Sequence, residues 1–159
     1  MRNRRLAAVL VAVLAVFTFV VPMASAQSVP TMSNIRTGQH PEYDRVVLDM
    51  SGLTPDYRLR EEPGAVNCGS GAPVSMPGSN EVLTVTVFHA AAHDDNGNST
   101  YPGSRNFATP GLSNIRRVAV TCDFEAVLTI AVGYENFNTW HRVSQLQNPA
   151  RLVIDIGRI

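Results

Sequence analysis

The sequence predicts an all-β protein, built as a β-sandwich and preceded by a signal peptide. Short segments at residues 45–50, 82–89 and 118–132 are rich in aliphatic and β-branched residues, and several alternate in polarity. The segments between them are dense in Gly, Pro and Ser, which favours loops. No stretch shows a sustained helical period with a cap at each end. Several short strands joined by such connections are typical of a sandwich.

The first residues predict export. Three arginines within the first five residues precede an apolar stretch at positions 6–21, and Ala24-Ser25-Ala26 then supplies the small residues of a cleavage site. The apolar stretch is shorter than the ~20 residues that span a bilayer comfortably. We therefore expect a signal peptide at residues 1–26, cleaved after Ala26, with a retained membrane anchor as the alternative. Gln27 would follow the cut, and because it is not Cys it offers no lipoprotein site.

The predicted product is a single domain with a slightly acidic charge. Residues 27–159 are enough for one core and too few for two. All 13 basic residues of the chain are arginines, three of them in the signal peptide, so the remainder carries a formal charge of −3. A slightly acidic domain without basic clusters is a poor candidate for binding nucleic acid. We expect a secreted or cell-wall-associated protein with no stable membrane insertion after cleavage.

The first half of the domain is expected to contain two strands and much loop. Residues 27–41 are polar and hold two prolines, which predicts a loose start, with a flexible arm at 27–34 and the domain at 35–159. A strand follows at 45–50, where Val46, Leu48 and Met50 face one side. A short strand is predicted at 56–60, followed by a loop at 61–80.

The second half is expected to be mostly strand. Residues 82–89 form the clearest candidate, and a polar loop with an Asp- and Asn-rich turn follows at 90–111. Apolar residues of one parity then run from Val118 to Val132, with a tight turn expected near Cys122-Asp123. Residues 139–143 are a weaker candidate, and 152–156 close the chain.

The two cysteines, Cys68 and Cys122, suggest a disulfide. In an exported chain an even number of cysteines favours bridging, and two cysteines allow a single pairing. Two buried free thiols are the alternative. No C-x-x-C spacing is present, which disfavours a zinc site.

Two segments repeat one pattern, Arg45–Met50 and Arg151–Ile156. Arg and Asp four residues apart on a strand share a face but lie ~13 Å apart, too far to pair. If the two strands are antiparallel neighbours, Arg45 can meet Asp155 and Arg151 can meet Asp49. A solvated outer face without such pairs is the alternative.

These segments also resemble a known family. The chain is similar to the AMIN-like domain of exported actinobacterial proteins in three segments. These are the run from Thr37 to Asp49, which includes Tyr43-Asp44-Arg45, the segment Asp123-Phe124-Glu125, and the run from Pro149 to Asp155. That family is named after the AMIN domain of cell-wall amidases. The resemblance covers about residues 35–156. It implies a two-sheet β-sandwich of the AMIN type and a targeting or binding role in the cell envelope.

No complete catalytic or metal-binding set is found, so we predict neither an enzyme nor a cofactor. His89 and His93 lack a following Glu, and the run from Asp94 to Asn98 lacks the glycine and glutamate that an EF-hand requires. No G-x-S-x-G motif is present. Asp123 and Glu125 are two apart on a strand, but so small a domain hardly forms a glycosidase cleft.

A binding role needs fewer residues. Aromatic rings bind sugars and peptides well, and the candidate residues are Tyr101, Tyr134, Trp140, His141 and Arg142. The alternative is that these rings fill the core. We expect a non-catalytic envelope module that binds a cell-wall peptidoglycan or polysaccharide. A module that binds an envelope protein is the second hypothesis, and a small hydrolase is the third.

Overall fold

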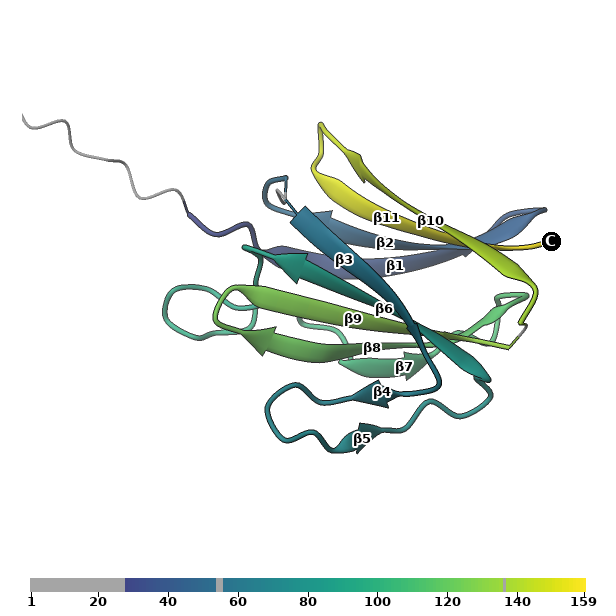
Figure 1. Cartoon of the computed structure of the whole chain (residues 1–159). Coiled ribbons are helices and arrows are strands. Elements are labelled where there is room, and N and C mark those ends of the chain that lie inside the picture. The colour runs from purple at the N-terminus through teal and green to yellow at the C-terminus, as the bar shows by residue number, and fades with distance from the viewer. Residues whose placement is uncertain (1–27, 54–55, 136) are drawn as a thin grey trace, which may run out of the picture.

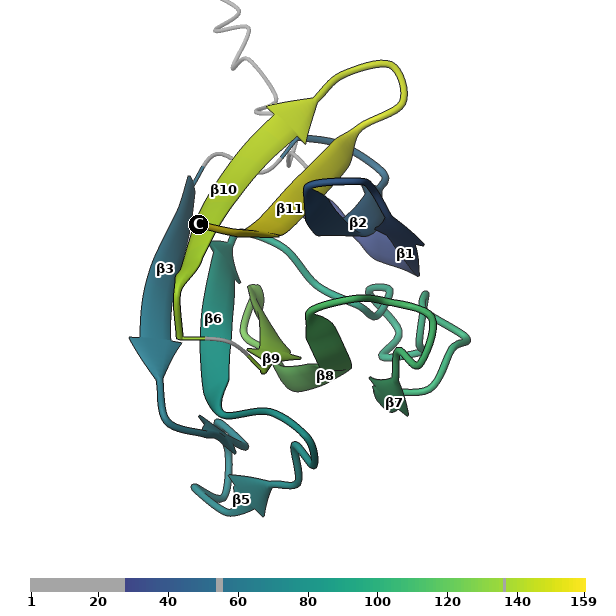
Figure 2. The same cartoon turned by 90° about the vertical axis from the view of Figure 1, so that its right-hand side faces the viewer.

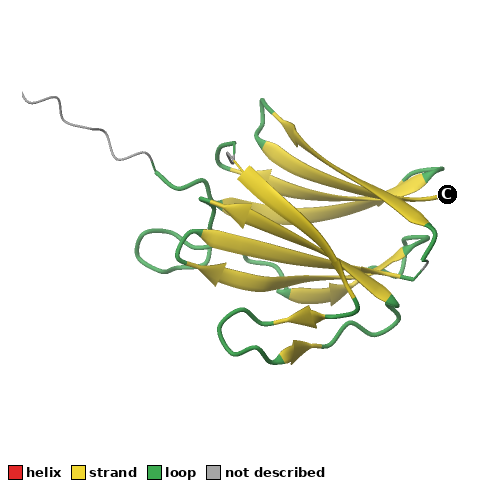
Figure 3. Ribbon diagram, in the orientation of Figure 1, coloured by secondary structure: helices red, strands yellow, loops and turns green. Residues whose placement is uncertain are grey.

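The computed structural model describes residues 28–53, 56–135 and 137–159, which contain strands and loops but no helix (Figure 3). The expected signal peptide and its cleavage after Ala26 lie outside these residues. Within the described part, no helix is long and apolar enough to cross a membrane.

Two antiparallel sheets lie face to face (Figures 1 and 2). The four-stranded sheet has the order β1 (Met32–Gln39), β2 (Tyr43–Met50), β11 (Arg151–Arg158), β10 (Thr139–Leu146). The five-stranded sheet has the order β3 (Asp56–Glu62), β6 (Glu81–Phe88), β9 (Val127–Tyr134), β8 (Ile115–Phe124), β7 (Asn106–Ala108). A hairpin of β4 (Ala65–Val66) and β5 (Pro73–Val74) lies outside the second sheet. The predicted all-β sandwich is confirmed.

The core lies between the sheets because each sheet turns one apolar face inward. Val46 and Leu48 from β2 and Ile154 from β11 are fully buried, opposite Leu83, Val85 and Ile130 of the other sheet. Side chains of a strand alternate between the two faces, so the neighbouring residues of β2 and β11 point outward. Alternate residues of each strand therefore form the outer face of the four-stranded sheet, in rows that run across the strands.

The start of the domain differs from expectation. The loose start predicted for residues 27–41 contains strand β1, which pairs with β2 from Met32↔Met50 to Gln39↔Asp44. The sequence of β1 is polar because β1 is an edge strand, of which Met32 and Ile35 alone are buried in the core. It therefore shows no apolar alternation that would predict a strand. The backbone N–H of Met32 donates to Ala91 O, which fixes this end of the strand to the loop after β6.

The β8–β9 hairpin also differs from the prediction. Its turn is at Glu125-Ala126, both with positive φ, three residues later than the expected turn at Cys122-Asp123. The register shifts between Val120 and Cys122, which adds a residue to β8 and reverses the side-chain parity beyond it. Phe124, expected on the same face as Val118, is therefore 64% exposed while Val118 is buried.

The predicted Cys68–Cys122 disulfide is present, with the two Cα atoms 5.2 Å apart. It joins the loop between β4 and β5 to the outer face of β8. Under this hairpin lies a second, smaller apolar cluster of Ala65, Val82, Ala119 and Ala131. The disulfide therefore holds a cover over part of the five-stranded sheet.

Candidate functional site

The outer face of the four-stranded sheet carries the candidate site. Strand register sets its rows: Tyr43 lies opposite Gly157, which lies opposite Trp140 on β10. In the next row, Arg45 lies opposite Asp155, which lies opposite Arg142. Residues that are 97 positions apart in the chain thus become lateral neighbours.

Three rings form what we call the aromatic platform: His40, Tyr43 and Trp140. The rings of His40 and Tyr43 are stacked with centroids 4.4 Å apart, and the Tyr43 ring is 5.9 Å from the Trp140 ring at a tilt of 59°. Gly157 lies under the indole, where a Cβ atom would overlap the Trp140 ring. The missing side chain therefore lets the indole lie down on the sheet, and all three rings stay partly exposed.

A charged row borders the platform. Arg45 donates two hydrogen bonds to Asp155, from Nε to Oδ1 at 2.7 Å and from Nη2 to Oδ2 at 2.9 Å, and Arg142 Nη2 donates to Oδ2 at 3.0 Å. The expected Arg45–Asp155 pair is thus confirmed. Burial alone disfavours the charged form of Asp155, but the hydrogen bonds from the two arginines outweigh it and lower the pKa of this carboxyl.

Both guanidinium groups also lie near the rings. The Arg45 guanidinium carbon is 5.2 Å from the centroid of the Tyr43 ring, and that of Arg142 is 5.8 Å from the Trp140 ring. These distances are within the range of cation–π attraction. The charges and the rings therefore form one continuous surface.

The second expected pair, Arg151 with Asp49, is opposite in register but does not form a salt bridge. Arg36 on β1 instead donates to both carboxylate oxygens of Asp49, at 2.8 and 2.6 Å. Arg151 Nε donates to Pro149 O at 3.2 Å. The prediction was wrong because residues 32–39, expected in a loose start, form a strand that brings Arg36 beside Asp49.

Asp44 lies between Tyr43 of the platform and Arg45 of the charged row, but its side chain points inward, toward the five-stranded sheet. Its carboxylate, 1% exposed, accepts backbone N–H groups of Ser113, Asn114 and Ile115 at 3.2, 2.5 and 2.9 Å. These amides precede or begin β8, so Asp44 joins the end of β2 to the opposite sheet. The recess beside it, which His40, Tyr43 and Arg158 help to line, holds about 70 Å³. That volume suits a few water molecules, so a larger ligand would lie across the surface.

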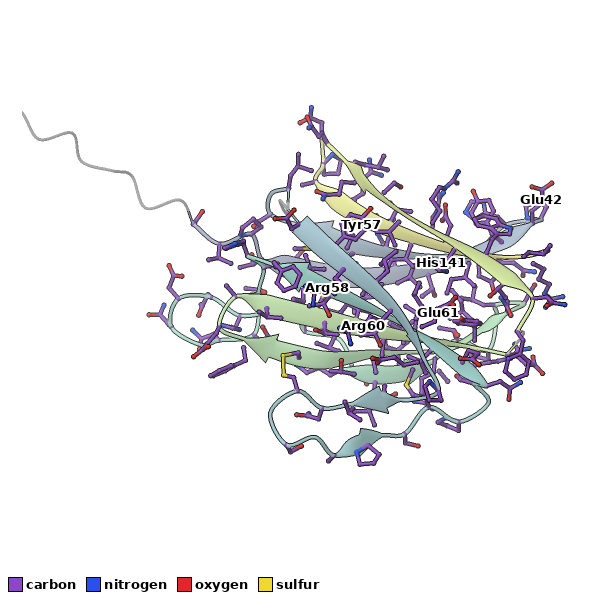
Figure 4. All side chains as sticks on the ribbon, in the orientation of Figure 1. Glu42, Tyr57, Arg58, Arg60, Glu61 and His141 are labelled. Atoms are coloured by element: carbon purple, nitrogen blue, oxygen red, sulfur yellow. A yellow bond between two sulfur atoms is a disulfide. The ribbon has the colours of Figure 1, made fainter. Side chains whose placement is uncertain are left out.

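The other binding candidates lie elsewhere. Tyr101 and Tyr134 are 5% and 3% exposed, in the core. Burial, followed by the charge of Glu61, raises the pKa of Tyr134 to about 12. His141, which the sequence groups with Trp140 and Arg142, lies on the inward face of β10, where Nδ1 is 3.2 Å from Glu61 Oε1 of β3 (Figure 4). Strand alternation thus separates His141 from its two neighbours.

Sequence reasoning missed His40 and Gly157 as parts of a site, and quoted Tyr43 only within a family motif. His40 and Tyr43 flank the turn between β1 and β2, which is a usable local signal. Gly157 offered none, because its role depends on the pairing of β10 with β11.

The motifs considered for catalysis or metal binding take structural roles. Asp123, 7% exposed at its side chain, accepts from the Ala92 N–H, contacts His93 Nδ1 at 2.8 Å and pairs with Arg105 at 2.7 Å. Glu125 lies in the hairpin turn instead of sharing a strand with Asp123. Asp94 Oδ1 accepts the N–H groups of Asn96 and Asn98, which makes an Asx-rich turn. Within residues 28–53, 56–135 and 137–159, no three His, Cys, Asp or Glu side chains are grouped to hold a metal ion.

Comparison with known proteins yields one family. A model described as the AMIN-like domain matches residues 30–158, which is nearly all of the described chain. The curated proteins contain no significant match, and neither do the solved structures. AMIN-like domains are non-catalytic modules associated with the cell wall and envelope. On the match over almost its whole length, the chain belongs to the AMIN-like domain family.

Proposed function

We propose that this domain is an exported, non-catalytic module that binds cell-wall glycan through the aromatic platform of His40, Tyr43 and Trp140. The observation that carries the proposal is the lateral arrangement of these partly exposed rings on one outer sheet face, with the Trp140 indole over Gly157. Sugar rings have apolar faces and polar edges, so they stack on aromatic side chains while their hydroxyls stay in water.

The surroundings of the platform support the proposal. Arg45 and Arg142 place N–H donors beside the rings, where sugar hydroxyls and carbonyls can accept hydrogen bonds. The ion pair with buried Asp155 fixes Arg45, whose side chain is 30% exposed. A rigid, preformed surface of this kind loses little conformational entropy on binding.

The test is retention of residues 27–159 on insoluble peptidoglycan. We expect the wild-type domain to be retained above a control protein of similar size and charge, and Trp140→Ala to lose about tenfold in affinity, or 1.4 kcal/mol. Phe124→Ala is the matched control, because Phe124 is an aromatic residue that is 64% exposed on the other sheet. Equal retention of the two variants would place binding elsewhere, and no retention of the wild type would contradict glycan binding.

The proposed site of action requires export. We propose that residues 1–26 are removed after Ala26 and that the product is secreted or wall-associated. Mass spectrometry of protein recovered from the medium and from the wall should give a chain beginning at Gln27. Recovery of the full-length chain in membranes alone would contradict cleavage.

A further inference from the structure

The outer face of the four-stranded sheet carries more positive than negative charge. Its strand residues include Arg36, Arg45, Arg142 and Arg151 and two carboxylates, Asp49 and Asp155, and the exposed Glu42 of the β1–β2 turn adds a third carboxylate beside the platform. The chain from Gln27 onward has the opposite balance, with three more acidic than basic residues. The excess of arginine is therefore a local property of the face that bears the aromatic platform.

We propose that the platform takes a carboxylate-bearing glycan, a polymer with acid groups attached to its sugar rings. The proposal rests on the proposed function and names the ligand class of the same site. Both strand carboxylates already receive a two-point hydrogen bond from one arginine, Asp155 from Arg45 and Asp49 from Arg36. The second arginine near each carboxylate, Arg142 and Arg151, supplies the excess charge.

Arg142 is the group best placed to meet a ligand acid. Its contact with Asp155 uses Nη2, and 61% of its side chain is exposed. The guanidinium has five N–H donors in a fork that matches a carboxylate. Its carbon is 5.8 Å from the Trp140 ring centroid, so a sugar that stacks on the indole brings its own acid group alongside. A polyol phosphate chain has the charge but no ring to stack, which favours an acidic sugar.

Trp140 is the only tryptophan of the chain, so its fluorescence reports on the platform directly. We would titrate the mature protein with hyaluronan hexasaccharide, in which every second sugar carries a carboxylate, and with neutral chitohexaose of equal length. We expect the acidic probe to bind at least tenfold more tightly at low salt, and the preference to shrink in 0.5 M salt because ions screen exposed charges. A glycerol phosphate oligomer is the third probe, expected to bind more weakly than hyaluronan.

Variants separate this inference from the proposed function. Arg142→Gln should bring the two sugar probes to similar affinity, while Arg142→Lys should keep part of the preference. Arg58→Gln, which changes an exposed arginine on the other sheet, should leave it unchanged. Equal binding of both sugars by the wild type, with loss of that binding in Trp140→Ala, overturns the proposal of an acidic ligand but supports the platform as the glycan-binding site. Tighter binding of the phosphate oligomer overturns the choice of a sugar acid, and no response to any probe overturns both proposals.

Discussion

At the residue scale, three consecutive side chains of β2 perform three different tasks. Tyr43 and Arg45 point outward, where one belongs to the aromatic platform and the other pairs with Asp155. Asp44 points inward and accepts three backbone N–H groups from the opposite sheet. Strand alternation explains how adjacent residues can serve both the surface and the link between the sheets.

Asp44 should therefore matter more for stability than its single charge suggests. Asp44→Ala leaves three N–H groups without their carboxylate acceptor, and we expect a loss of about 3 kcal/mol in the free energy of unfolding. Asp44→Asn keeps one acceptor oxygen and should cost less. Chemical denaturation followed by circular dichroism measures both. Asp95→Ala, in an exposed loop position, is the control, and a loss in Asp44→Ala no greater than in that control would contradict the assigned role.

At the element scale, the strands predicted from hydrophobic patterning are those that supply fully buried side chains to the core. Residues 45–50, 82–89 and 152–156 fall within or next to β2, β6 and β11. β1 escaped prediction because an edge strand with few core side chains looks like a polar arm. The position of the β8–β9 turn was missed because a bulge reverses parity and leaves no trace in composition.

The β4–β5 hairpin is the element held in place by the disulfide. Cys68→Ser with Cys122→Ser removes a cross-link between residues 54 positions apart, which costs about 4 kcal/mol in the chain-entropy model. The denaturation midpoint should fall, and amide hydrogen exchange should accelerate in residues 65–74, since only non-covalent contacts then hold them. These are the apolar contact with Val82, Ala119 and Ala131 and the hydrogen bond from the backbone N–H of residue 68 to Thr121 O. Wild-type protein under reductant should behave like the double variant. An unchanged midpoint in both would contradict a stabilising bridge.

At the scale of the whole molecule, three carboxylates make stability depend on acid pH. Asp123 and Asp155 are buried, which opposes ionisation, yet hydrogen bonds from their partners lower the pKa of each below its usual value. The hydrogen bond from Arg36 does the same for Asp49. Because the folded state holds these protons more weakly than the unfolded state, the stabilisation is present above the unfolded pKa of about 4 and is lost as pH falls below it.

We therefore expect a nearly constant denaturation midpoint from pH 7 to 5 and a steep fall below about pH 4. Asp155→Asn should be less stable than the wild type at pH 7 and should show a shallower acid decline, since one of the linked carboxyls is gone. Urea titrations at several pH values give both quantities. A decline in Asp155→Asn as steep as in the wild type would show that Asp155 does not contribute.

The sequence by itself determined the β-sandwich class, the resemblance to the AMIN-like family and the single possible cysteine pairing. It also offered the Arg45–Asp155 pair, but only as one alternative beside an Arg151–Asp49 pair that does not form and a solvated face without pairs. Only the tertiary structure decided which aromatic residues share a surface. Tyr101 and Tyr134 lie in the core, and His141 faces Glu61. Tyr43 and Trp140 met across Gly157 because the order and register of β2, β11 and β10 are set by long-range pairing, which no local pattern encodes.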